Sequence, residues 1–368
     1  MPRVVRMVRV AQRQHCAHRP PRVRGVRHAC RAAPGTSPRA HHRGAVVTPG
    51  TPARGCRTLA AAVALITANA SAQTCSVGTP SLAFTAFSPI SGAALNATGT
   101  IPVTCTWPLL GANPNVKACL ALNAVPPLTL TNAANAIRFG LFVDAAYANT
   151  WGSSPGNMIA LTMTAPPLGG TLTQNVSFYG KIDAAQTTVP TSGDANTVYS
   201  HTFGAADISL QYASYALLAP APACGSAMTA APGVPFTSNV TVINNCTIAA
   251  TNITFASQST LTTDVSGSGQ LTIQCTNNDA YRVALSGGIS GSVSTRRMTG
   301  TTGASVDYQL YLDSARTTIW GDGTSGTSQL TGIGSGLVQF VPIYARVPSQ
   351  STPPPGVYTD TVTATIQF

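Results

Sequence analysis

Residues 99–105, Gly-Thr-Ile-Pro-Val-Thr-Cys, alternate between apolar and small polar side chains. The alternation returns at 270–275, Gln-Leu-Thr-Ile-Gln-Cys, and at 359–366, Thr-Asp-Thr-Val-Thr-Ala-Thr-Ile. A period of two residues is typical of a β-strand with one buried face, so each stretch is predicted to be such a strand. Helical periodicity is nearly absent after residue 72, and Gly-rich segments such as 332–336 are predicted to be hairpin turns. The chain is therefore predicted to be all-β.

The chain repeats itself at an offset of about 170 residues, and spacing kept over such a length indicates two copies of one domain. The landmarks that return are Cys75 as Cys246, Phe84 as Phe255, Cys105 as Cys275, Leu141–Asp144 as Leu310–Asp313, and Trp151 as Trp320. We expect two tandem immunoglobulin-like β-sandwiches, residues 73–218 and 246–368. Residues 219–245, rich in Ala and Pro at their start, are expected to be a linker. The repeated Asp and Trp residues are expected to be structural, since both copies carry them.

The positive charge of the chain lies in its first 72 residues. They hold 13 of the 21 Lys and Arg and no acidic residue, so the remainder has 8 basic and 10 acidic groups. This distribution argues against a nucleic-acid partner. The apolar run 59–66 and Ala70-Ser71-Ala72 are typical of a signal peptide, with Gln73 as the mature N-terminus. We expect translation to start at Val46 or Val47; the alternative is a disordered basic tail.

Six cysteines follow the expected signal peptide, an even number that is typical of disulfides in an oxidising compartment. The repeat predicts Cys75–Cys105 and Cys246–Cys275, and elimination leaves Cys119–Cys224.

The last predicted strand runs to Phe368, so the second sandwich is expected to be one strand short. It is expected to borrow a strand from a partner along the edge at Val362, Ile366 and Phe368.

The second copy resembles the spore coat protein U domain, the pilin fold of archaic chaperone–usher pili. The resemblance rests on Cys246 through Cys275, Tyr308–Asp313, Trp320–Gly323, Tyr344–Val347 and Pro355–Val362. It covers essentially all of 246–368, and the first copy matches more loosely, with longer and more apolar insertions. A literal role in a spore coat is an alternative.

The resemblance implies an incomplete fold, a periplasmic chaperone, an outer-membrane usher and a next pilin subunit that donates a strand. Only Gln73 and Thr74 would precede Cys75 after cleavage, so the chain is expected to receive a strand but not to donate one. Such a subunit belongs at the fimbrial tip on the cell surface. Residues 234–243 alternate like a donor segment and are expected to complete the first domain; the alternative is that they begin the second.

The insertions of the first copy are the predicted site, because loops carry function and exposed apolar patches mark contact surfaces. We expect hydrophobic loops that bind apolar or abiotic surfaces and support biofilm formation. The residues are Trp107, Pro108, Leu109, Leu110, Val125, Pro126, Pro127, Leu128, Met158, Ile159, Leu161, Met163, Pro167 and Leu168. Trp107 and the Pro-Pro-Leu segments are expected to be exposed, while Ile159 and Leu161 alternate and fit a buried strand equally well.

An enzyme is not expected. His201 is the only histidine after residue 72, the chain has no Glu, and no residues have metal-ligand spacing, so no catalytic residue, cofactor or metal is predicted. One alternative function is a carbohydrate-binding tip lectin that uses the polar loops 183–186 or 192–196. Another is a minor adaptor pilin with no adhesive role.

Overall fold

The computed structural model describes residues 3–4, 73–109 and 111–368. The expected basic leader, start of translation and signal peptide lie outside the described residues, apart from Arg3–Val4. Within the described part of the chain, no helix is long and apolar enough to cross a membrane. The only helical turns described are short 3₁₀ segments, at Pro89–Ser91, Pro155–Asn157 and Gly288–Ser290.

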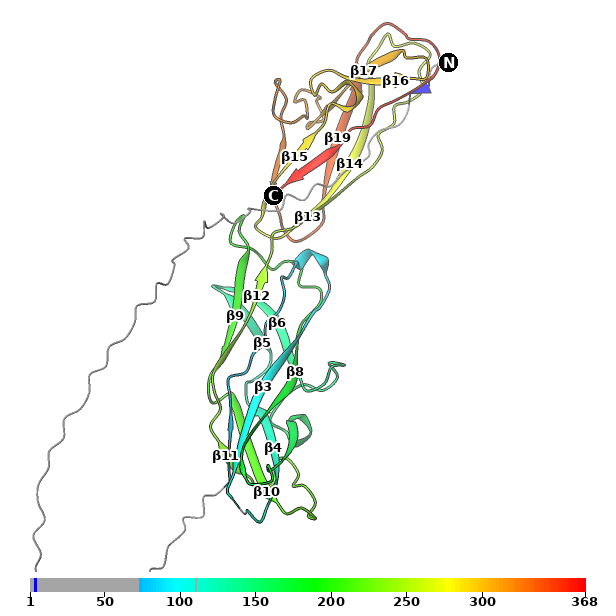
Figure 1. The fold of residues 1–368 in the computed structure, drawn as a ribbon. Coiled ribbons are helices and arrows are strands. Elements are labelled where there is room, and N and C mark those ends of the chain that lie inside the picture. The colour runs from blue at the N-terminus through cyan, green and yellow to red at the C-terminus, as the bar shows by residue number, and fades with distance from the viewer. Residues whose placement is uncertain (1–2, 5–72, 110) are drawn as a thin grey trace, which may run out of the picture. The chain divides into compact units, whose positions relative to one another are not determined.

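The first sandwich has two sheets of antiparallel strands. One sheet has the order β12-β9-β5-β6-β8-β3-β2, and the other has the order β11-β10-β4-β7. In Figure 1, β3 and β8 run side by side, and they pair over their full length. The strands are β2 Thr74–Val77, β3 Leu95–Trp107, β4 Asn115–Leu122, β5 Leu128–Asn132, β6 Asn135–Phe142, β7 Ile159–Thr164, β8 Gly170–Ile182, β9 Thr197–Phe203, β10 Ile208–Tyr215, β11 Thr229–Ala231 and β12 Phe236–Val242.

The second sandwich repeats this plan with shorter strands (Figure 1). One sheet has the order β20-β16-β17-β19-β14-β13, with β1 (Arg3–Val4) beside β20, and the other has the order β18-β15-β21. The strands are β13 Cys246–Ala250, β14 Val265–Cys275, β15 Ala280–Leu285, β16 Arg296–Gly300, β17 Ser305–Tyr311, β18 Leu330–Ile333, β19 Gln339–Val347, β20 Val357–Thr359 and β21 Ala364–Gln367. The prediction of an all-β chain with two sandwiches is confirmed.

The residues shared by both copies support the fold. Each sandwich buries its own apolar core, and one tryptophan in each core donates from Nε1 to a backbone carbonyl 2.9 Å away, Trp151 to Leu120 and Trp320 to Val283. Asp313 accepts hydrogen bonds from Thr317 and Thr318, and those bonds lower the pKa of its carboxyl to about 2, led by the bond from the Thr318 N–H. These residues are structural, as expected.

The three predicted disulfides are present, and each has a distinct place. Cys75–Cys105 joins β2 to β3, and Cys246–Cys275 joins β13 to β14. Cys119–Cys224 joins β4 to the connection between β10 and β11, across 105 residues of sequence. The third bond therefore fixes a long connection to the sheet of the first sandwich.

Two predictions of local structure are wrong. The stretch 359–366 is not one strand, because the chain leaves β20 at Thr359 and enters β21, in the other sheet, at Ala364. Between them Asp360 turns inward, and its carboxylate accepts hydrogen bonds from Tyr308 Oη and the Ile289 N–H. Residues 332–336 are not a hairpin, since β18 pairs with β15 and β19 pairs with β14.

The segment 219–245 contributes two strands to the first sandwich. β11 pairs with β10, and β12 pairs with β9 over seven residues. On its other side β12 has parallel bridges to the segment around Ala83 and Phe87, where the Phe87 N–H donates to the Thr241 carbonyl at 2.9 Å. The apolar residues of β12 point into the core; they are Phe236, Val240 and Val242.

Candidate functional site

Three connections of the first sandwich emerge at one end of a single sheet. Residues 111–114 lead into β4 at Asn115, and Pro108 and Leu109 precede them after β3. Residues 165–169 follow β7, which ends at Thr164, and residues 216–218 follow β10, which ends at Tyr215. The sheet register pairs Asn115 with both Thr164 and Tyr215. Antiparallel pairing thus brings together connections that are up to about 100 residues apart in sequence.

This end of the sandwich exposes four leucines. The exposed fractions are 67% for Leu109, 80% for Leu168, 70% for Leu217 and 97% for Leu218. We call these four residues the apolar end. Exposed apolar side chains that gather in one place mark contact surfaces on soluble domains. The sequence pattern does not mark Leu217 and Leu218 as a surface feature, because they directly precede an Ala-Pro run that is typical of a linker.

A small pocket of about 210 Å³ lies between two of these connections. The β3–β8 register places Trp107 opposite Gly170, so Pro108 and Leu109 face residues 165–169. Gly169 has a φ of +72°, and a Cβ there would lie 2.8 Å from the Pro108 carbonyl oxygen. Glycine is therefore required where the two connections touch. The walls are uncharged: Trp107, Pro108, Leu109, Gly111, Pro114, Ala165, Pro166, Pro167, Leu168 and Gly169.

Several residues predicted for the surface are buried. β7 alternates strictly, so Ile159, Leu161 and Met163 face the core, and Met158 packs near the Cys119–Cys224 bond. Leu128 begins β5 and is 6% exposed. Trp107 ends β3 and is 3% exposed, so the prediction that this ring is exposed is wrong. These side chains lie on the faces of their strands that point into the core, because successive residues of a strand point to opposite faces.

The apolar insertions named from the sequence do not all lie at one end of the sandwich. Val125 is 83% exposed and the flanking prolines 126 and 127 are exposed, but this connection follows Leu122, at the opposite end of β4 from Asn115. An eight-residue strand separates the two ends by roughly 25 Å. Leu110 lies outside the described residues. The surface residues that remain together are Pro108, Leu109, Pro167 and Leu168.

The polar loops of the lectin alternative form hydrogen bonds within the sandwich. Gln186 is 9% exposed; its Oε1 accepts from the Arg138 N–H and its Nε2 donates to the Arg138 carbonyl. In the other loop the Ser192 N–H donates to Thr197 Oγ1 at 2.7 Å. His201 is likewise structural, with Nδ1 2.7 Å from the Thr129 carbonyl oxygen.

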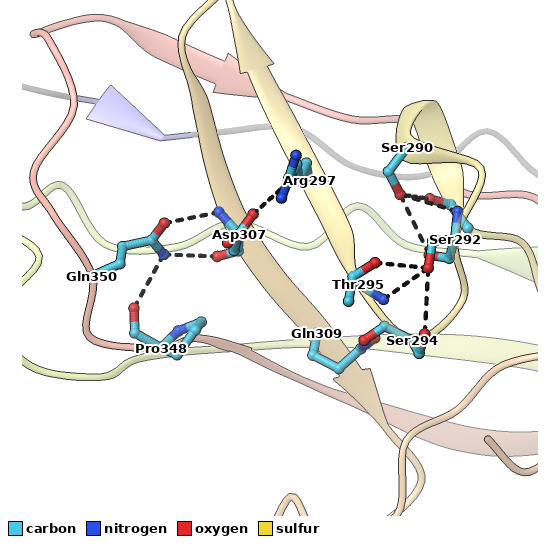
Figure 2. Close-up of polar contacts among 10 residues, drawn as sticks. Ser290, Ser292, Ser294, Thr295, Arg297, Asp307, Gln309, Pro348 and Gln350 are labelled. Atoms are coloured by element: carbon cyan, nitrogen blue, oxygen red, sulfur yellow. Dashed lines mark hydrogen bonds and ion pairs between the residues drawn. The ribbon is translucent and has the colours of Figure 1, made fainter. Parts of the chain in front are cut away.

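A polar pocket of about 310 Å³ lies on the second sandwich and is lined by Ile289, Ser290, Ser292, Thr295, Arg297, Thr299 and Ser305. Figure 2 shows hydrogen bonds that join three of these residues, Ser290, Ser292 and Thr295. Arg297 Nε is 2.8 Å from Asp307 Oδ1, and Ser292 Oγ lies 2.7 Å from Thr295 Oγ1. The Gln350 amide group also binds the backbone of Asp307 (Figure 2). The arrangement stabilises loops around β16 and β17.

The edge predicted to receive a strand lies at β20 and β21. Val362 and Ile366 are buried, and Phe368 is half-buried. β20 in the second sandwich corresponds to β9 in the first. β20 pairs with β16, and β9 pairs with β5, the strand that corresponds to β16. The outer side of β9 is covered by β12. No strand from residues 73–368 lies along the outer side of β20. Among the described residues, the strand that pairs with β20 on this side is Arg3–Val4.

The comparisons with known proteins identify the family. The family model for the spore coat protein U domain matches residues 60–200 and 234–365. The chain belongs to this family and carries its domain twice. It is 40% identical to Protein U of Myxococcus xanthus over 119 residues, 30% of this chain and 64% of that protein's length.

Two solved structures of pilus subunits are similar at low identity. One is the CsuC–CsuE chaperone–tip adhesion subunit pre-assembly complex of the archaic chaperone–usher Csu pili of Acinetobacter baumannii. It has 16% identity and a TM-score of 0.46, over 80% of this chain and 100% of that one. The other is the CupB6 tip adhesin of Pseudomonas aeruginosa. It has 9% identity and a TM-score of 0.33, over 79% of this chain and 98% of that one.

Proposed function

We propose that this protein is the tip subunit of a chaperone–usher pilus, exported through the periplasm, which attaches cells to surfaces. The observation that carries the proposal is the asymmetry between the two copies of the domain. The first sandwich has β12 beside β9, supplied by the same chain. The second has no such strand beside β20 within residues 73–368.

Apart from Arg3–Val4, this edge of β20 has no strand beside it in the described part of the chain, and such an edge readily pairs with a strand from another chain. In the proposed assembly a periplasmic chaperone, and then the next pilin subunit at the usher, supplies that strand to the second sandwich. β12 shows what such a strand needs, since it alternates buried and exposed residues over seven positions. Residues 74–77 are not free to act as a donor strand, because β2 pairs with β3 and Cys75 is bonded to Cys105.

The apolar end supports the adhesive half of the proposal. Its four leucines are at least two-thirds exposed, and prolines at 108, 114, 166 and 167 restrict the backbone of two of its connections. A restricted loop loses less conformational entropy when it docks on a surface. Apolar and abiotic surfaces are therefore the proposed targets, with biofilm formation as the consequence.

Adhesion to polystyrene tests this function in cells that display the protein. We expect the simultaneous replacement of Leu109, Leu168, Leu217 and Leu218 by serine to reduce adhesion at least tenfold. Each change removes a leucine side chain whose full burial contributes a free energy of roughly 1.5–3 kcal/mol. Val125→Ser is the matched control, since Val125 is equally exposed at the other end of β4. Normal adhesion of the quadruple variant at equal surface display would refute the adhesive role. Inhibition of wild-type adhesion by a free sugar would favour the lectin alternative.

A further inference from the structure

Half of the apolar end belongs to the long connection between β10 and β11. We call this connection, residues 216–228, the strap. Leu217 and Leu218 lie near its start and are among the most exposed apolar residues of the described chain. In the described part of the chain, each hydrogen bond of the strap joins two of its own residues. Hydrogen bonds therefore do not hold the strap on the sandwich.

The Cys119–Cys224 disulfide bond fixes the strap to the middle of β4. Leu120 belongs to the core of the sandwich, whereas Cys119 packs with Met158 in a separate cluster, against which Cys224 and Met228 lie. Successive residues of a strand point to opposite faces of the sheet. The strap therefore lies over the face of the sheet that points away from the core.

The bond leaves little slack between the leucines and the sheet. Cys119 lies four residues along β4 from the apolar end, a span of roughly 13 Å. Cys224 follows Leu218 by six residues, and a proline-rich segment of that length spans roughly 19 Å. Without the bond, the next fixed residue is Thr229 in β11, and the eleven residues from Leu218 can reach roughly 36 Å. The bond thus restricts where the leucines can lie.

The fold itself does not require this bond. The hydrogen bonds of the two core tryptophans match Leu120 with Val283, and hence Cys119 with Arg282. Arg282 is exposed, and its strand β15 still pairs with a strand on each side. The cysteine pair is therefore specific to the copy that carries the apolar end, which points to a role in attachment.

We propose that the Cys119–Cys224 bond positions Leu217 and Leu218 for attachment, so that these cysteines are positioning residues of the adhesive surface. The inference rests on the proposed function and deepens it. Cys119 is fully buried, so it contributes through the strap and makes no contact with the target surface. A segment that is already restricted loses less conformational entropy when it docks, and the bond therefore strengthens adhesion.

Two insertions of four glycines test this role in cells that display the protein. One insertion lies between Ala221 and Pro222, on the side of the bond that carries the leucines. The control lies between Ser226 and Ala227, on the other side, and both keep every side chain and the disulfide. We expect the first to reduce adhesion to polystyrene about three- to tenfold, because it restores slack, and the control to adhere like the wild type. Adhesion of the first variant that equals or exceeds that of the control, at equal surface display, would overturn the inference.

Removal of the bond provides a second readout. We expect Cys119→Ala combined with Cys224→Ala to reduce adhesion about three- to tenfold in the wild-type background. The same changes should reduce it less than about twofold when Leu217 and Leu218 are already replaced by serine, because the bond acts through these leucines. An equal factor in both backgrounds would indicate a purely structural role and would overturn the inference. The insertions remain decisive if the cysteine variant does not fold.

Failure here is distinct from failure of the proposed function. If the quadruple leucine variant loses adhesion while the two insertion variants adhere alike, only the inference is wrong. If the quadruple leucine variant adheres normally, the proposed function is wrong whatever the insertions show.

Discussion

Among single residues, the two copies differ in β5 and β16, the strands next to β9 and β20. The strand registers match Leu128 with Arg296 and Phe139 with Tyr308. Where the first sandwich is apolar, the second buries a guanidinium. Arg296 donates to the carbonyls of Leu285, Ser286 and Trp320 and to Gln309 Oε1. Burial lowers the pKa of this guanidinium, while the neighbouring Tyr308 and Asp360 act in the opposite direction.

The neighbouring arginines Arg296 and Arg297 provide a matched pair of changes. Arg296→Met should destabilise the protein by about 3–5 kcal/mol, because it leaves buried carbonyls and a glutamine oxygen without donors. Arg297→Met should cost less than about 1 kcal/mol, since its ion pair with Asp307 is exposed. Urea denaturation of both variants measures the difference. Similar midpoints for the two would show that the buried network does not stabilise the fold.

Among the strands, β12 belongs to the first sandwich and supports its fold in two ways. Phe236 stacks on Phe203 of β9, with ring centroids 4.6 Å apart and planes 8° apart. The hydrogen-bond ladder with β9 extends from Phe236 to Val242. The strand therefore contributes both backbone pairing and core side chains to the first sandwich, although it lies directly before Cys246 in sequence.

Phe236→Ala should destabilise the first sandwich by about 3–5 kcal/mol, because it removes a buried ring from the core. Asn239→Ala, on the exposed face of the same strand, should change stability by less than about 0.5 kcal/mol. Limited proteolysis under increasing urea measures both.

A fragment of residues 73–245 should also be more protease-resistant than 73–233. Equal resistance of the two fragments would argue that β12 is not needed for closure.

At the scale of the whole molecule, charge is sparse, so few groups control how stability depends on pH. The carboxyls of Asp144, Asp313 and Asp322 accept hydrogen bonds that lower their pKa values. Asp279 is the opposite case. Its side chain is fully buried, and burial raises its pKa to about 7. In the pH range from about 4 to 7, the folded chain therefore holds a proton at Asp279 that the unfolded chain has lost.

Stability from Asp279 should be full below its unfolded pKa of 3.8 and should be lost as pH rises through about 7. Urea midpoints at pH 5 and pH 8 measure this loss, and Asp279→Asn should reduce the difference. Asp313→Asn is the control, because a pKa lowered to about 2 gives stability that is lost only in acid. An equal pH 5 to pH 8 difference in wild type and Asp279→Asn would contradict the assignment.

The two sandwiches and the bonds Cys75–Cys105 and Cys246–Cys275 could be predicted from the sequence, because strand alternation and cysteine spacing are local signals that repeat at an offset of about 170 residues. Cys119–Cys224 followed by elimination. The sequence also marked Pro108–Leu109 and Pro167–Leu168 as surface features. It did not show that Trp107 is buried with an unpaired N–H, since alternation does not say how far a strand continues before its turn. Which connections share an end could be seen only in the folded chain. Strand register places 108–114, 165–169 and 216–218 together and puts Val125 at the opposite end of β4, and register depends on long-range pairing that no local pattern encodes.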